Sequence, residues 1–341
     1  MTPSELDRGS PDPDARARVA VVRQRPWWRH LWVLVPVVVA AELVAQAVVS
    51  WRVPRTRDWQ EARTVLARER RPGDLVASAP WWTDPLARLH FGDMIALKDA
   101  ARPDATRYRR ALVATAYGLE HPDFQGWTEA STTRTGRLVV RTLVNPHPVE
   151  VHYDFVDHLR APDASVSRVG DATENCTWTT GEFVAGGGLS QGALPPPDRF
   201  RCTETWNYVG VTYIEDLQHR GRRCIWSHPV QGAAMVTRYE RVPLGTILHG
   251  HHGIAYEAER GDDHGQSFAG PDGGPVVLTV KVDDTEVGRS THTDGEGWKA
   301  FEFDTRAYAG TAHTVTFEVR ASFAGMRHYC FEGDARTAVP R

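Results

Sequence analysis

The chain has 341 residues, of which 41% are hydrophobic, and its formal net charge is −3 at pH 7. That apolar fraction can build packed cores, which excludes a wholly disordered chain, and the length predicts two domains. The near-neutral charge argues against a nucleic-acid binder, because phosphate contacts normally require an excess of basic residues. We therefore expect no nucleic acid among the partners.

The first predicted element is an apolar run from Leu31 to Val49, within a membrane anchor at 30–51. Sixteen of its nineteen residues are apolar, and its length of roughly 28 Å matches the ~30 Å hydrocarbon core of a bilayer. Glu42 near the centre costs about 3 kcal/mol of insertion, which the leucine and valine residues offset. We interpret the run as an uncleaved membrane helix. A cleaved signal peptide and a buried core helix are the alternatives.

The arginines that flank this run predict its orientation. Six arginines lie in the basic tail 1–29, whereas Arg52, Arg55 and Arg57 follow the run. The excess of positive charge before the helix favours a cytoplasmic N-terminus. We therefore expect a single-pass protein of the inner (cytoplasmic) membrane, with its bulk exported to the periplasm or cell surface.

All four cysteines lie after the anchor, as expected for disulfides in an exported region. Four cysteines allow three pairings. The spacing of the loops and the domain division favour Cys176–Cys202 and Cys224–Cys330.

Helical and strand patterns alternate over 58–165, which predicts a small α/β domain. An amphipathic helix at 58–70, with Asp58 as its N-cap, precedes a short buried strand at 74–77. A second helix is expected over 93–101. Strands should follow at 111–116, 137–143 and 149–156.

The stretch DWQEARTVLARERRPGDLV, followed by RYRRALVATAYG, resembles the exported soluble segment of some bacterial GT-C-type glycosyltransferases, over 58–160. That family has many membrane helices and an acidic catalytic residue in an exported loop. Because this chain has one predicted membrane helix, the resemblance implies at most a detached or accessory form of the soluble part, without the catalytic activity.

The segment 166–204 is rich in glycine and proline near its end and is expected to be a loop or linker. Beyond it, at 205–335, apolar residues alternate with polar ones, which predicts an all-β sandwich of jelly-roll type. About nine short strands are expected, at 209–215, 222–227, 233–240, 246–256, 278–282, 285–291, 301–303, 314–320 and 327–332. The DGEGWKAFEFDT stretch and its neighbours resemble the jelly-roll sugar-binding modules of exported enzymes.

Four side chains of the predicted sandwich are candidate ligand-binding residues: Trp226, His228, Trp298 and Tyr329. Aromatic rings stack on the apolar face of a sugar, whose hydroxyls need polar partners at the rim. The alternative is that Trp226 and Trp298 are core residues of two strands.

His249, His251 and Glu257 are a candidate metal set. Positions i and i+2 of a strand share a face, so the two histidines could reach one divalent ion. The stretch resembles the first metal-binding motif of a cupin, although its spacings depart from that motif. The resemblance implies a metal-dependent enzyme, and no other cofactor is expected. Histidines on the surface or in a groove of a sandwich are the alternative.

Two weaker motifs complete the survey. The residues 188–192 match the G-x-S-x-G pattern of serine hydrolases, but the three prolines that follow favour a loop over the required helix. Asp262, Asp263 and Asp272 are interpreted as solvated loop acids or a calcium site. With no convincing catalytic set, our leading hypothesis is a non-catalytic envelope protein that binds a glycan or another envelope protein.

Overall fold

The computed structural model describes residues 31–102, 104–181, 195–203, 206–260 and 274–337. The chain forms two compact units, Met1–Val53 and Pro54–Arg341. The predicted basic tail 1–29 lies outside the described residues.

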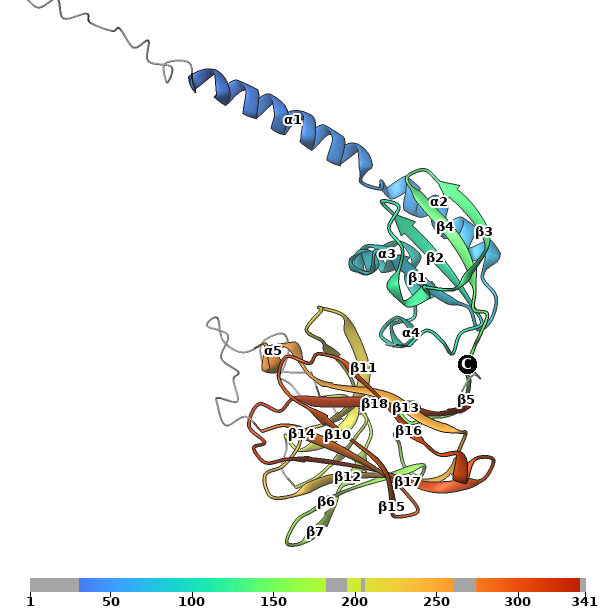
Figure 1. Ribbon diagram of the computed structural model, residues 1–341, viewed down its shortest axis with the longest axis vertical. Coiled ribbons are helices and arrows are strands. Elements are labelled where there is room, and N and C mark those ends of the chain that lie inside the picture. Colours follow the sequence, from blue (N-terminus) through green and yellow to red (C-terminus); the bar gives the residue numbers. More distant parts are fainter. Residues whose placement is uncertain (1–30, 103, 182–194, 204–205, 261–273, 338–341) are drawn as a thin grey trace, which may run out of the picture. The chain divides into compact units, whose positions relative to one another are not determined.

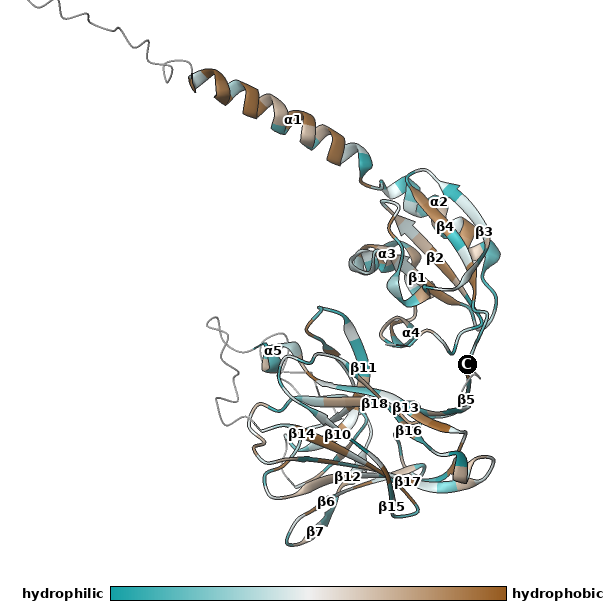
Figure 2. Ribbon diagram, viewed as in Figure 1, coloured by the Kyte–Doolittle hydropathy of each residue, from teal (hydrophilic) through white to brown (hydrophobic). Residues whose placement is uncertain are grey.

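Within the first unit, helix α1 spans Leu34–Arg52 and has no buried residue. It is largely hydrophobic along its length (Figure 2). Its length and composition are sufficient to cross a membrane, a test that a signal sequence near an N-terminus also passes. The complete exposure of α1 does not support the alternative of a buried core helix.

The second unit begins with a small mixed sheet (Figure 1). Its strands, in the order β1-β2-β4-β3, are β1 Leu75–Ala79, β2 Arg110–Ala116, β4 Leu138–Val144 and β3 Thr128–Thr135. Strand β1 is parallel to β2, and the other pairs are antiparallel. Helices α2, Thr56–Glu69, and α3, Asp84–Phe91, share a hydrophobic core with one face of this sheet. On the other face, Leu75 and Val113 form a second cluster with Phe124.

The first predicted helix is present, but its N-cap differs from the prediction. The cap is Arg55, and Asp58 is the third helical residue, whose Oδ2 accepts a hydrogen bond from the Arg55 backbone N–H at 2.8 Å. Asp58 therefore stabilises the helix start from inside the first turn.

The second predicted helix, at 93–101, was wrong in extent. Only α4, Leu97–Ala100, is regular α-helix there, whereas α3 was not predicted. Pro85 starts α3, and Gly92 ends it with φ 56°, a conformation that glycine adopts without steric cost. Strand β3 was also missed, because its sequence TEASTTRT has no apolar alternation.

The remaining strands form two sheets, as the sequence predicted for a sandwich. The eight-stranded sheet contains β5 Glu150–Asp154, β8 Thr177–Thr179, β9 Arg199–Arg201, β10 Tyr208–Glu215, β11 Gly221–Ser227, β13 Ile247–Ile254, β16 Lys299–Asp304 and β18 Tyr329–Thr337. The six-stranded sheet contains β6 Ala164–Val169, β7 Thr173–Asn175, β12 Ala234–Pro243, β14 Val276–Val282, β15 Thr285–His292 and β17 Ala312–Ala321. Both sheets contribute to one large hydrophobic core.

All nine strands expected after residue 205 are present within a few residues of their predicted bounds. The expected linker at 166–204 instead contains most of β6 and all of β7, β8 and β9. Strand β5, expected in the α/β domain, pairs with β18 of the sandwich. Most of these missed strands are short and polar, so they carry no apolar alternation that a local pattern could reveal.

Both predicted disulfides are present. Cys176 pairs with Cys202 across 26 residues, and Cys224 pairs with Cys330 across 106 residues. The first closes the segment that was expected to be a linker, and the second joins β11 to the neighbouring strand β18.

Candidate functional site

A cavity of about 440 Å³ lies where the small sheet meets the turn between β10 and β11 of the sandwich; we call it the seam cavity. Its walls come from β1, the start of α3, the 99–108 segment, the 121–124 turn and residues 219–221. The amide of Arg223 donates to the Ala101 carbonyl at 3.0 Å, which joins the two sides beside the cavity.

Aromatic side chains form much of the wall. Trp81, Tyr108 and Phe124 line the interior, together with Trp82, which is 53% exposed. The indole of Trp82 stacks on the exposed ring of Tyr117, with centroids 5.6 Å apart and planes inclined by 28°. Tyr117 has φ 60°, an uncommon backbone conformation for a residue with a side chain. This exposed stacked pair gives the cavity an aromatic edge.

Polar groups of different kinds accompany these rings. The Ser78 hydroxyl is buried and has no hydrogen-bond partner among protein atoms. The Tyr108 hydroxyl donates to Asp99 Oδ1 at 3.0 Å. Burial, and then the Asp99 charge, raise the pKa of Tyr108, so its phenol stays protonated.

His121 supplies a neutral donor. Its Nδ1 accepts the Asp123 backbone N–H at 3.2 Å, which assigns the ring proton to Nε2. Burial lowers the pKa of His121, so the ring is uncharged near neutral pH.

The charged groups in the wall are largely paired with one another. Arg88 contacts Asp84 at 2.6 Å, and Arg220 of the sandwich contacts Asp123 of the small sheet at the same distance. These pairs leave ring faces, hydroxyl groups and the Asp99 carboxylate as the groups best placed for a ligand. A cavity with such a lining is suited to an uncharged, polyhydroxylated molecule.

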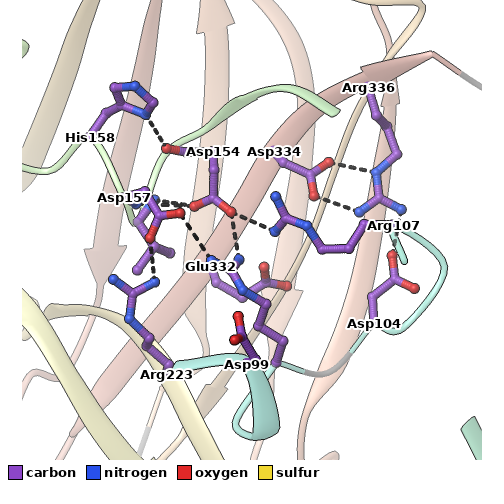
Figure 3. Close-up of polar contacts among 12 residues, drawn as sticks. Asp99, Asp104, Arg107, Asp154, Asp157, His158, Arg223, Glu332, Asp334 and Arg336 are labelled. Atoms are coloured by element: carbon purple, nitrogen blue, oxygen red, sulfur yellow. Dashed lines mark hydrogen bonds and ion pairs between the residues drawn. The ribbon is translucent and has the colours of Figure 1, made fainter. Parts of the chain in front are cut away.

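A largely buried ionic network lies beside the seam cavity (Figure 3). Asp154 Oδ2 accepts hydrogen bonds from Arg102 at 2.5 Å and from Arg107 at 2.6 Å. Asp157 contacts Arg102 at 3.1 Å and Arg223 of β11 at 2.7 Å. The network therefore fixes Arg102, which also lines the cavity, against the sandwich.

A second part of the network centres on Arg336 of β18, which lies between Asp334 and Asp104 (Figure 3). Each contact is 2.5 Å long. Burial would raise the pKa of Asp104, but the Arg336 charge and hydrogen bonds from Thr106 lower it to about 2. Asp104 stays ionised and holds this wall of the cavity to the sandwich.

The four predicted ligand-binding residues do not form one exposed surface. Tyr329 is fully buried, and its hydroxyl lies 2.8 Å from His252 Nδ1. Trp226 is 5% exposed and stacks on Tyr208. Tyr329 and Trp226 are therefore core residues without a free ring face for a sugar. This corrects the prediction for Tyr329 and Trp226, whose strand pattern could not distinguish a core position from a binding face.

Trp298 and His228 are both half-buried. Trp298 packs against the cluster that contains Trp226 and lies 5.9 Å from the Arg222 guanidinium. His228 neighbours Trp226 and is contacted edge-on by Trp206, which is 50% exposed. Sugar binding at Trp298 and His228 stays a prediction.

The predicted metal set is not assembled. The rings of His249 and His251 are 5.1 Å apart on β13, but the acid beside His251 is Glu332 of β18, at 2.7 Å. The chain leaves β13 after Ile254 and carries Glu257 into helix α5, Tyr256–Glu259. Among the described residues, no group of three or more His, Cys, Asp or Glu side chains could hold a metal ion.

Burial, and then the Arg336 charge, lower the pKa of His249 to about 4, so its ring is uncharged near neutral pH. The serine motif at 188–192 and the acids Asp262, Asp263 and Asp272 lie outside the described residues.

No protein-family model matches the chain, and no curated protein matches it. The resemblance to the GT-C-type segment therefore stays a prediction. Several solved structures share a weak likeness. The CBM51-2 and INT domains of Clostridium perfringens ZmpB are 14% identical, with a TM-score of 0.27, over 55% of this chain and 40% of that one.

Two further structures are a cyclase from Fischerella sp. TAU and the tandem CBM51 modules of Sp3GH98, a family 98 glycoside hydrolase from Streptococcus pneumoniae. The cyclase is 10% identical, with a TM-score of 0.28, over 53% of this chain and 88% of that one. The tandem modules are 9% identical, with a TM-score of 0.28, over 52% of this chain and 49% of that one. The chain thus spans less than half the length of the two CBM51 structures.

Sequence reasoning missed the seam cavity, although one signal pointed to it. Trp81 and Trp82 follow the end of the buried strand β1 after one intervening residue, and ligands of α/β proteins commonly bind beyond the carboxyl ends of parallel strands. The parallel partner β2 and the turn from the sandwich become visible only in the tertiary structure.

Proposed function

We propose that this chain is a membrane-anchored, exported binding protein that recognises a carbohydrate in the seam cavity. The observation that carries the proposal is the combination, in one cavity, of an exposed tryptophan edge with buried hydroxyl and imidazole donors. The volume of the seam cavity, about 440 Å³, is within the range of small-molecule sites. The proposal keeps the predicted ligand class and moves the site from the sandwich to its junction with the small sheet.

The ring of Trp82 is the expected stacking surface. Substitution of Trp82 by alanine should lower carbohydrate affinity about tenfold, because it removes about 1.4 kcal/mol of stacking. The measurement uses the full-length chain in lipid nanodiscs, titrated with a panel of glucose, mannose, N-acetylglucosamine and their homo-oligomers of two to four units.

The matched control is Trp206→Ala, since Trp206 is equally exposed (50%) but lies on the sandwich beside His228. This control should bind as the parent does. Absence of binding to every sugar of the panel would sink the proposed function. If Trp206→Ala lost binding and Trp82→Ala kept the parental affinity, the site would lie on the sandwich instead.

The anchoring proposal rests on α1 and on the two disulfides, which suit an oxidising compartment. We expect an impermeant maleimide, added to intact cells, to label a cysteine introduced at Arg289, whose side chain is 58% exposed. A cysteine introduced at Ser10, before the helix, should stay unlabelled until the cells are lysed. The reverse labelling pattern would contradict the orientation.

A further inference from the structure

A second cavity of about 290 Å³ adjoins the seam cavity and shares His121 and Phe124 with it. Its remaining walls include Val113, Thr115 and Leu143, from strands β2 and β4. Val113 and Leu143 belong to the cluster on the sheet face opposite α2 and α3, where Leu75 and Ala77 of the seam cavity also lie. The two cavities are therefore neighbouring hollows on one face of one sheet.

The second cavity repeats the chemistry of the first. Trp127 lines it as a half-buried ring, packed edge-on against the shared Phe124 with centroids 5.0 Å apart. Phe124 in turn lies 4.9 Å from the ring of His121. A continuous row of rings thus leads from the shared His121 and Phe124 to the tryptophan of the second cavity.

The second cavity also offers polar groups to a ligand. Arg141 Nε is buried and makes no hydrogen bond, but it lies 3.6 Å from Glu129 Oε2, and a terminal nitrogen of the same guanidinium donates to Glu120 at 2.9 Å. The Thr115 side chain lines the same wall. In the seam cavity the corresponding unpaired group is the Ser78 hydroxyl. Each cavity therefore contains tryptophan and a buried polar atom that makes no hydrogen bond within the protein.

We propose that the two cavities are adjacent subsites for one carbohydrate chain, so that the ligand is an oligosaccharide of at least two sugar units and not a single sugar. This inference rests on the proposed function of the seam cavity. His121 and Phe124, which belong to both cavities, lie where the linkage between the two units would pass. The uncharged His121 ring can donate from Nε2 to a linkage or ring oxygen there.

The test compares the affinity of each oligomer with that of its own monomer, for the full-length chain in nanodiscs. The probes are glucose, mannose and N-acetylglucosamine and their homo-oligomers of two to four units. The parent should bind an oligomer about tenfold or more tightly than the monomer, because a second stacked unit adds binding energy. Trp127→Ala should reduce this ratio to about one, whereas Trp82→Ala should weaken both monomer and oligomer.

Arg141→Gln provides a second variant, because it leaves the Trp127–Phe124 packing in place and should still lower the ratio severalfold. Trp206→Ala on the sandwich should keep the parental ratio. A parent that binds monomer and oligomer equally would overturn the two-subsite inference while the proposed function stands. A parental oligomer-to-monomer affinity ratio in folded Trp127→Ala and folded Arg141→Gln would overturn the inference too. If no sugar of the panel binds, both the proposed function and the inference fail.

Discussion

Replacement of Asp154 by asparagine should lower the free energy of unfolding by about 3–5 kcal/mol, because it removes the carboxylate that Arg102 and Arg107 share and leaves Arg102 only its longer contact with Asp157. The side chains of Asp154 and Arg102 are 7% and 9% exposed, and that of Arg107 is 19% exposed. Asparagine retains an oxygen that can accept from the Val156 and Asp157 amides, as Asp154 Oδ1 does at 3.0 and 3.1 Å. The substitution therefore removes charge with little change in shape.

Urea unfolding of the full-length protein in nanodiscs, followed by tryptophan fluorescence, measures the loss. Asp163→Asn is the matched control, since Asp163 pairs with Arg160 at 3.1 Å while both side chains are about one-third or more exposed. That exposed pair should contribute less than about 1 kcal/mol. An equal decrease in the free energy of unfolding of the two variants would show that burial does not make the Asp154 ion pairs more stabilising than an exposed pair.

The effect of Asp154 should also depend on pH. Burial alone would raise its pKa, but the charges of Arg102 and Arg107 outweigh burial and hold the pKa below its usual range. Because the carboxyl is more acidic when folded than when unfolded, its contribution is complete above a pH of about 4 and is lost on further acidification. The difference between parent and Asp154→Asn should therefore shrink below that pH. A difference that persists unchanged would contradict an electrostatic origin.

The second large effect is expected from the long-range disulfide. Cys224 and Cys330 are 106 positions apart in the sequence, whereas Cys176 and Cys202 are 26 positions apart. The first disulfide therefore closes the longer loop. By the loop-entropy relation, removal should cost about 4–5 kcal/mol for the first and about 3.5 kcal/mol for the second. Both sulfurs of the first bridge belong to residues that are fully buried.

The comparison uses two double variants, Cys224→Ala with Cys330→Ala and Cys176→Ala with Cys202→Ala, unfolded in urea under identical conditions. The first should show the lower midpoint. An equal or higher midpoint would mean that loop entropy does not decide the difference, and that strain or residual structure does. A parent in which both disulfides are reduced should be less stable than either variant, because it lacks both loop closures.

The sequence alone predicted the elements whose signal is local. Helix α1 is apolar over most of its length, and α2 has a regular apolar face that includes Trp59, Val65 and Leu66. Several of the nine strands after residue 205 follow a period-two alternation, as Val315, Phe317 and Val319 do on β17. Such patterns report the burial of one face, which is a property of consecutive residues.

Elements without a local pattern were missed or misplaced. Strand β3 is polar and largely exposed, and β7, β8 and β9 have three residues each. They are strands because of hydrogen bonds to partners, such as the pairing of β9 with β10. The same limitation made Trp226 and Tyr329 look like binding residues, although packing from both sides buries them.

Local sequence patterns were therefore sufficient to predict an apolar helix, a small α/β sheet and a sandwich with two disulfides. The cavity that we propose as the binding site is visible only in the tertiary structure. The seam cavity depends on contacts between distant residues, among them Arg220 with Asp123 and Arg336 with Asp104, which are 97 and 232 positions apart. The physical reason is that an ion pair or a cavity wall depends on distance in space, and chain-local patterns carry no information about which distant segments meet.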